Sequence, residues 1–222
     1  MEAAIFDMDG VLVDTEDIYY NFLRNHLRGM GVALGVEYEQ FRIDYRGSTT
    51  FDLWEGIKKQ YGLNASVRGE LVPIARKAYL SHIENLPSLE PIAGVTALIG
   101  RLFDAGLKLA VASSSSRARI PLMLKRIGVY DYFPHFVSSD DVTRGKPAPD
   151  CYLLAAEKIQ ADPTRCVVFE DAIHGIAAAK AAGMKTVGFN GLKSSPREFC
   201  EGDINVMRFA DVDIAALRRL FS

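Results

Sequence analysis

Two carboxylates follow the first apolar segment of the chain at a spacing that could support chemistry. Residues 3–6 are apolar, and Asp7 and Asp9 come directly after them, with Gly10 next. Like charges this close raise each other's proton affinity, so something must stabilise them. A bound metal ion, a catalytic role for each carboxylate and helix capping are three explanations, and the rest of the chain bears on the choice.

Further polar residues follow later apolar segments or lie in the loops between them. They are Ser113, Ser114, Lys146, Glu170 and Asp171. Taken singly, each has an ordinary explanation, such as a helix cap or an exposed lysine. Together they suit phosphoryl transfer, because carboxylates bind Mg²⁺, an aspartate can act as the nucleophile, and cations neutralise the phosphate oxygens.

The pattern around these residues alternates between strand and helix. Short β-rich runs are separated by helical patterns at 117–127, 150–159 and 172–182, and the runs themselves are 3–6, 107–113, 135–141, 166–171 and 185–189. This alternation predicts a parallel sheet with helices on both faces. Ligands bind such sheets at the carboxyl ends of the strands, so the polar residues are expected to converge there.

Residues 15–85 carry a different pattern, without any strand signal. Apolar and aromatic residues recur at helical spacing over 18–30, 51–61 and 71–83, and Pro73 predicts a kink in the third segment. We therefore expect an all-helical domain, residues 15–85, inserted into an α/β core formed by residues 1–14 and 86–222.

The composition limits the classes of function. The 222 residues are 49% hydrophobic and 24% charged, which suits a folded core, and the net charge of −2 gives no broad attraction to nucleic acid or membranes. No apolar run approaches the roughly 18 residues that span a bilayer, and no basic segment precedes the first apolar run. Three scattered cysteines fit thiols in a reducing compartment. We expect a cytoplasmic protein, a monomer or weak dimer, without nucleic-acid or membrane partners.

Four stretches resemble the motifs of the haloacid dehalogenase-like hydrolase superfamily. They read FDMDGVLVDT, VASSSS, GKPAPDCY and VFEDAIHGIAAAKAAGM. The helical insert resembles the cap of the β-phosphoglucomutase-like branch. The resemblance implies a Rossmann-like three-layer core with a central parallel sheet and an inserted all-helical cap. It also implies a Mg²⁺-dependent enzyme acting on a small phosphate ester, with sugar phosphates first among the candidates.

The resemblance implies a role for each of the polar residues. Asp7 would be the nucleophile that forms an aspartyl-phosphate, and Asp9 would be the general acid and base. Ser113, Ser114 and Lys146 would bind the phosphoryl group.

The implied metal ligands and substrate contacts involve both domains. The Mg²⁺ ligands would be Asp7, the backbone carbonyl of Asp9, Asp171 and, directly or through water, Glu170. Substrate contacts are expected in the cap loop DYRGSTT, at Arg46, Gly47 and Ser48. Arg46 could bind a carboxylate, a second phosphate or sugar hydroxyls, although an exposed loop arginine accounts for it equally well.

Two departures from the mutase pattern favour water as the phosphoryl acceptor. A histidine of the first cap helix in that pattern is Tyr19 here, and a cap lysine is Ala75, with Arg76 and Lys77 adjacent. We therefore expect a phosphatase, with a sugar phosphomutase as the alternative. A non-catalytic phosphometabolite-binding protein is disfavoured, because the implied nucleophile, acid/base and lysine are all present.

Overall fold

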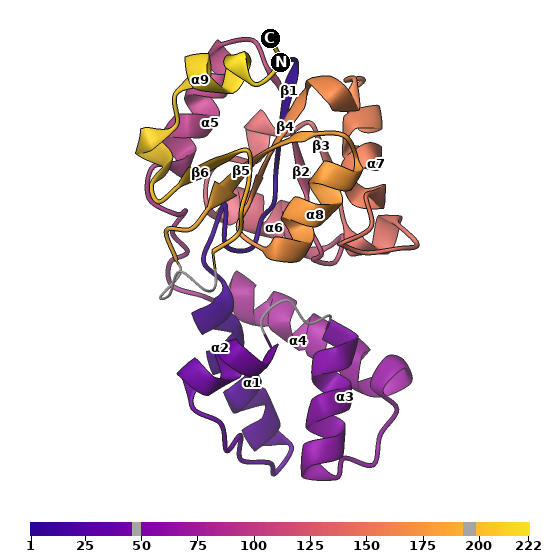
Figure 1. Ribbon diagram of the computed structural model, residues 1–222. Coiled ribbons are helices and arrows are strands. Elements are labelled where there is room, and N and C mark those ends of the chain that lie inside the picture. Colours follow the sequence, from indigo (N-terminus) through magenta and orange to yellow (C-terminus); the bar gives the residue numbers. More distant parts are fainter. Residues whose placement is uncertain (46–49, 193–198) are drawn as a thin grey trace. The chain divides into compact units, whose positions relative to one another are not determined.

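The chain divides into two compact units in the computed structural model, which describes residues 1–45, 50–192 and 199–222. Met1–Asp14 and Ser88–Ser222 form the first unit, and Thr15–Pro87 form the second. The first unit is an α/β domain and the second is all-helical, inserted after the first strand (Figure 1). The predicted fold class is confirmed: a Rossmann-like core with an inserted helical domain.

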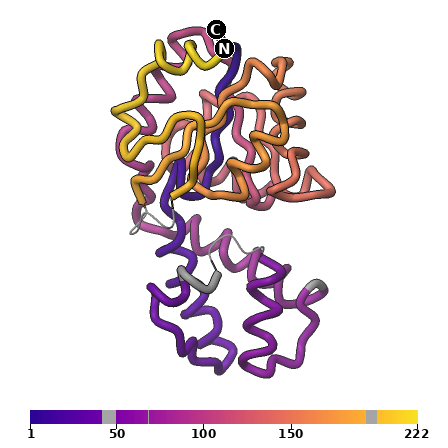
Figure 2. The backbone as a smooth tube through the Cα atoms, in the orientation of Figure 1, coloured from indigo at the N-terminus to yellow at the C-terminus, as the bar shows by residue number. Residues whose placement is uncertain are grey.

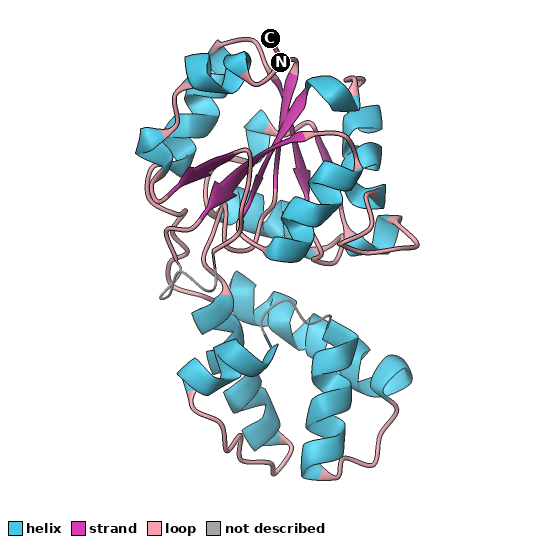
Figure 3. Ribbon diagram, in the orientation of Figure 1, coloured by secondary structure: helices cyan, strands magenta, loops and turns pink. Residues whose placement is uncertain are grey.

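A six-stranded parallel sheet organises the described part of the first unit (Figure 3). Its strands are β1 (Ala3–Phe6), β2 (Lys108–Ala112), β3 (His135–Val137), β4 (Cys166–Glu170), β5 (Lys185–Phe189) and β6 (Ile204–Val206). They lie in the order β3-β2-β1-β4-β5-β6. The chain moves outward from β1 to β3 and then returns to β4, so the order reverses beside β1, where sheets of this kind bind ligands.

Helices cover both faces of this sheet. They are α5 (Val95–Asp104), α6 (Arg119–Arg126), α7 (Asp150–Lys158), α8 (Ile173–Ala181) and α9 (Ile214–Arg219). Helices α7 and α8 pack together on one face, over small residues such as Ala110 and Val168. The other face is aromatic: Phe6 and Phe169 stack at 4.6 Å, and Phe209, in a turn that packs against α5, continues this layer.

The helical unit has its own apolar core. Its helices are α1 (Glu16–Gly29), α2 (Tyr38–Tyr45), α3 (Thr50–Tyr61) and α4 (Val72–Glu84), with a π-helical turn at Val67–Leu71. Leu23, Trp54 and Ile83, from three different helices, are fully buried. The chain passes between the two units at 14–15 and at 87–88 (Figure 2). No helix in the described ranges is long and apolar enough to cross a membrane.

Pro73 lies in the first turn of α4, directly after the π-helical turn Val67–Leu71, and the kink predicted there stays a prediction. One local prediction was wrong. The strand predicted over 135–141 ends at Val137, because Ser138 begins a 3₁₀ turn instead. Its hydroxyl accepts from the Asp140 N–H at 3.2 Å, and the Asp141 carboxylate accepts from the Ser138 N–H at 2.8 Å.

Candidate active site

Asp7 lies at the carboxyl end of the central strand β1. Its N–H donates to the carbonyl of Phe169 in β4 at 3.0 Å, so the sheet fixes the backbone that carries the side chain. Asp7 is only 6% exposed. Burial raises the pKa of the Asp7 carboxyl well above its ordinary value, Lys146 opposes this shift, and Glu170 adds to it. An ionised carboxylate at this position therefore depends on a nearby cation.

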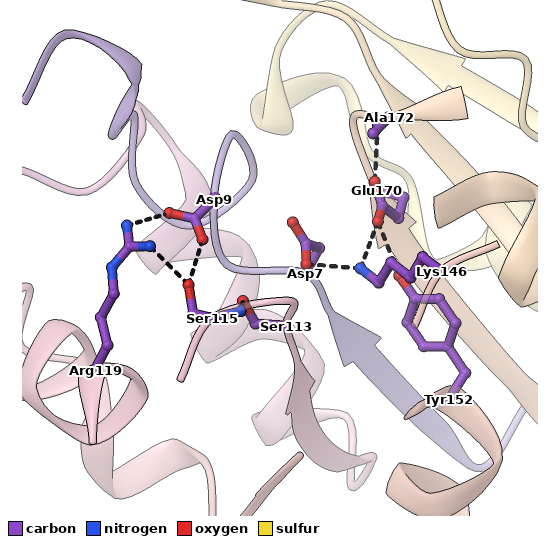
Figure 4. A network of polar contacts seen from close by, with 9 residues as sticks. All are labelled: Asp7, Asp9, Ser113, Ser115, Arg119, Lys146, Tyr152, Glu170 and Ala172. Carbon is purple, nitrogen blue, oxygen red and sulfur yellow. Dashed lines mark hydrogen bonds and ion pairs between the residues drawn. The ribbon is translucent and has the colours of Figure 1, made fainter. Parts of the chain in front are cut away.

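Lys146 supplies that cation. Its Nζ donates to Asp7 Oδ1 at 2.7 Å and to Glu170 Oε1 at 2.6 Å (Figure 4). Burial alone would lower the pKa of Lys146, but the two carboxylates outweigh it and raise the pKa well above its ordinary value. The lysine, whose side chain is 9% exposed, therefore carries its charge inside the site. Residues 139 positions apart in the chain are joined in this way.

Glu170, at the end of β4, is held on both carboxylate oxygens. Tyr152 donates its hydroxyl to Oε1 at 3.1 Å, and the N–H of Ala172 donates to Oε2 at 2.8 Å. The Tyr152 ring also lies 4.8 Å from the Lys146 ammonium, close enough for a cation–π contact. Sequence reasoning gave Tyr152 no role, although it closes the motif GKPAPDCY.

A glycine of α8 makes room for the Glu170 carboxylate. A Cβ at Gly175 would overlap both oxygens of Glu170, which is 1% exposed and has little space to move. Gly175→Ala is therefore expected to displace this carboxylate. On the predicted role of Glu170 as a Mg²⁺ ligand, the substitution should lower kcat/KM by about 100-fold and weaken Mg²⁺ binding, measured by calorimetry, by at least about 10-fold.

Gly100 in α5 is the matched control, because a Cβ there would meet no heavy atom within 4 Å. Gly100→Ala should leave kcat/KM and the affinity for Mg²⁺ unchanged, and should raise the free energy of unfolding by about 0.5–1 kcal/mol. Equal effects of the two substitutions would contradict the packing of Glu170 against Gly175.

Three carboxylates form a group that fits a magnesium ion. Asp7, Glu170 and Asp171 can each place an oxygen within 4.8 Å of the others. Asp171 packs against the backbone of Gly10, where a Cβ would lie 2.5 Å from Asp171 Oδ2, so it stands beside the loop of Asp7. Hard oxygen donors with no histidine or cysteine in the group match the preference of Mg²⁺.

The serine cluster follows β2, the strand beside β1. Ser113 is buried, its N–H donates to the Val137 carbonyl at 3.0 Å, and its Oγ accepts from the Ser115 N–H at 3.1 Å. The neighbouring Ser114 is exposed. The register of the parallel strands places Ser113 at the same sheet edge as Asp7. Phosphate binding by Ser113 and Ser114 stays a prediction.

Asp9 turns toward a different group of residues. Its Oδ2 accepts from the Ser115 hydroxyl at 2.7 Å, and its Oδ1 accepts from Arg119 Nη2 at 2.6 Å. Figure 4 shows Asp7 facing Lys146 and Asp9 facing Arg119. Sequence reasoning missed both partners of Asp9, although an arginine four residues after a serine at the start of a helix was a readable signal.

Other sequence candidates lie elsewhere. Arg46, Gly47 and Ser48 fall outside the residues that the structure describes. His174 is exposed on α8, and the cysteines are buried thiols at 151, 166 and 200.

Comparison with known proteins identifies the class of protein that this fold and site define. Residues 4–189 match the model of the haloacid dehalogenase-like hydrolase family. The chain belongs to this family.

Its relatives include both phosphatases and a mutase. The chain is 34% identical over 186 residues to the fructose-1-phosphate phosphatase YqaB of Escherichia coli (strain K12), covering 82% of this chain and 93% of that protein. It is 33% identical over 199 residues to the β-phosphoglucomutase of Bacillus subtilis (strain 168), covering 85% and 83%. These relatives place it in the β-phosphoglucomutase-like branch.

A solved structure shares the fold over nearly the whole chain. The crystal structure of CbbY from Rhodobacter sphaeroides in complex with phosphate superimposes with a TM-score of 0.87 at 23% identity, covering 98% of this chain and 99% of that one.

Proposed function

We propose that the protein is a Mg²⁺-dependent phosphatase that hydrolyses a small phosphate monoester, in the first place a sugar phosphate. Its family and its phosphatase-named relatives support a phosphatase-class enzyme acting on a phosphorylated small molecule. The observation that carries the mechanism is the buried Asp7 carboxylate, which Lys146 holds at 2.7 Å beside Glu170 and Asp171. This arrangement gives a nucleophile and a cation in one site.

In the first half-reaction, an Asp7 oxygen attacks phosphorus and the bond from phosphorus to the leaving oxygen breaks. Asp9 donates a proton to that oxygen, so the alcohol departs neutral. Lys146, Ser113 and Ser114 bind the phosphoryl oxygens. Mg²⁺, bound by Asp7, Glu170, Asp171 and the backbone carbonyl of Asp9, would neutralise phosphoryl charge.

In the second half-reaction, water attacks the phosphorus of the aspartyl-phosphate. Asp9, now ionised, takes a proton from this water. The bond from phosphorus to the Asp7 oxygen breaks, which releases inorganic phosphate and restores the Asp7 carboxylate. Asp9 thus serves as acid and then as base, and no other proton carrier is needed.

A sugar phosphomutase is the second candidate, favoured by the identity to β-phosphoglucomutase. A mutase must keep water from its phospho-aspartate until the sugar intermediate has turned round. The two cap positions that carry cationic groups in the mutase pattern hold Tyr19 and Ala75. The Tyr19 ring packs edge-on against Tyr79 at 5.0 Å, and Ala75 is buried, so both residues pack within the helical unit. These contacts support hydrolysis.

The fate of β-glucose 1-phosphate tests the choice between the two reactions. With Mg²⁺ and glucose 1,6-bisphosphate present, inorganic phosphate is expected to exceed glucose 6-phosphate by at least about 10-fold, because water accepts the phosphoryl group. Both products are measured in the same samples by coupled assays. Formation of glucose 6-phosphate with little phosphate release would establish the mutase instead.

The remaining assignments are proposals of the same kind. The core is assigned to residues 1–14 and 86–222, and the helical unit, residues 15–85, acts as a cap that selects the substrate. Its selecting residues are Arg46, Gly47 and Ser48. The net charge of −2 and the buried cysteines support a cytoplasmic protein, a monomer or weak dimer, that binds neither nucleic acid nor membranes.

A further inference from the structure

Asp9, Ser115 and Arg119 form a closed triangle of hydrogen bonds within the α/β unit. Arg119 uses two different nitrogens: Nη2 donates to Asp9 Oδ1 at 2.6 Å, and Nη1 donates to Ser115 Oγ at 2.7 Å. The Ser115 hydroxyl donates in turn to Asp9 Oδ2 at 2.7 Å. Both carboxylate oxygens therefore accept hydrogen bonds from partners that are themselves bonded to each other (Figure 4).

The triangle is partly removed from water, which strengthens its interactions. The Arg119 side chain is 15% exposed and the Asp9 side chain 32% exposed. Because the guanidinium of Arg119 is planar and donates from two nitrogens, it fixes the orientation of the Asp9 carboxylate as well as placing a positive charge beside it. Ser115 is buried, and its own N–H is held by Ser113 Oγ at 3.1 Å, so the support of Asp9 is tied to the phosphate-binding loop.

We propose that Arg119, together with Ser115, is a positioning residue for the proton transfers of Asp9. This inference rests on the proposed function, in which Asp9 protonates the leaving group. When Asp9 has given up its proton, it becomes a carboxylate whose two oxygens accept the bonds seen here. The pair thus stabilises the product of proton transfer and holds the same carboxylate ready to take a proton from water.

The proposal predicts an effect that depends on the leaving group. Phenyl phosphate and p-nitrophenyl phosphate differ little in shape, but phenolate is much more basic than p-nitrophenolate and needs a proton as it leaves. In a two-step mechanism, kcat/KM reports the first half-reaction. Arg119→Met, which keeps an apolar stem, should lower kcat/KM by about 30-fold for phenyl phosphate and by less than about 3-fold for p-nitrophenyl phosphate.

Three further variants test whether the loss comes from the hydrogen bonds to Asp9. Arg119→Lys keeps the charge on a single donor nitrogen, and should recover phenyl phosphate turnover to within about 5-fold of the wild type. Ser115→Ala should show the same leaving-group preference, with a smaller loss of about 5-fold. Arg117→Met is the matched control from the same loop, since Arg117 pairs with Asp141 instead and should leave both esters unaffected.

The Asp9→Asn variant separates this inference from the proposed function. Its kcat/KM should fall selectively for phenyl phosphate, and adding Arg119→Met to it should lower that kcat/KM by less than about 2-fold more, because the positioned group is gone. Equal losses on both esters in Asp9→Asn would overturn the acid role of Asp9. A selective Asp9→Asn combined with an unselective or silent Arg119→Met would overturn only the role of Arg119. Should Arg119→Met fail to fold, Ser115→Ala takes its place: a selective loss on phenyl phosphate supports the positioning role, and an unselective or silent substitution overturns it.

Discussion

Asp7→Asn is expected to reduce kcat by about 10⁵-fold or more, the scale of loss when an enzyme's nucleophile is removed. An amide cannot attack phosphorus, whereas the shape and the acceptor oxygen that faces Lys146 are retained. The fold should survive at full stability. Burial raises the pKa of Asp7 in the folded protein, so its ionisation opposes folding as pH rises above the unfolded pKa. Phosphate release measures the loss of kcat, and urea unfolding at pH 7 measures the stability.

A control for this substitution lies at the opposite end of the sheet. Asp203 accepts hydrogen bonds from the N–H and hydroxyl of Thr186, both at 2.7 Å, near the start of β5. Asp203→Asn should lower stability and leave kcat within about 2-fold of the wild type. An Asp7→Asn enzyme with near-normal kcat would remove Asp7 from the role of nucleophile.

Lys146→Met is expected to affect both rate and stability. It removes the cation that is proposed to bind the phosphoryl group, which should lower kcat/KM by about 10³-fold. It also leaves Asp7 and Glu170 buried without their ion-pair partner, at a cost of about 3 kcal/mol in the free energy of unfolding near neutral pH.

The pH dependence of this loss has a definite sign. Lys146 opposes the raised pKa of Asp7, so without it the folded pKa of Asp7 rises further above its unfolded value, and stability falls as pH increases through that range. The loss measured by urea unfolding without added metal should therefore be smaller at pH 5 than at pH 8. Lys158→Met, at the exposed end of α7, should cost less than about 0.5 kcal/mol at both values. A loss for Lys146→Met that does not change with pH would contradict the buried ion pair.

The sequence predicts the central part of the site because parallel strands end at a common edge. Asp7 and Glu170 follow or close apolar strands, and adjacent register is enough to bring them together. The loop lysine was placed correctly beside them only because its loop follows a strand of the same sheet. Their neighbours were harder to predict. Tyr152 reads as an apolar residue of a helix face, and only the packing of α7 turns its hydroxyl toward Glu170.

The spacing of Ser115 and Arg119 is local, but their contact with Asp9 depends on tertiary placement. Arg119 begins α6, and its guanidinium donates a hydrogen bond to Asp9, which lies 110 positions earlier in the chain. Short elements were missed for a related reason. The three residues of β6 are too few to show alternation, and they form a strand because β5 offers an edge to pair with. Helix α2 likewise has little amphipathic pattern of its own.

Trapping the phosphorylated enzyme tests directly whether Asp7 is the nucleophile. Asp9→Asn enzyme mixed with Mg²⁺ and p-nitrophenyl phosphate should release about one equivalent of p-nitrophenol rapidly, because this leaving group needs no proton and the water attack lacks its base. Acid quenching, borohydride reduction and peptide mapping then locate the acyl phosphate as a reduced side chain. Reduction is expected at position 7, and none is expected when Asp7→Asn is added. A burst with reduction at another residue, or turnover without any trapped acyl phosphate, would contradict this role of Asp7.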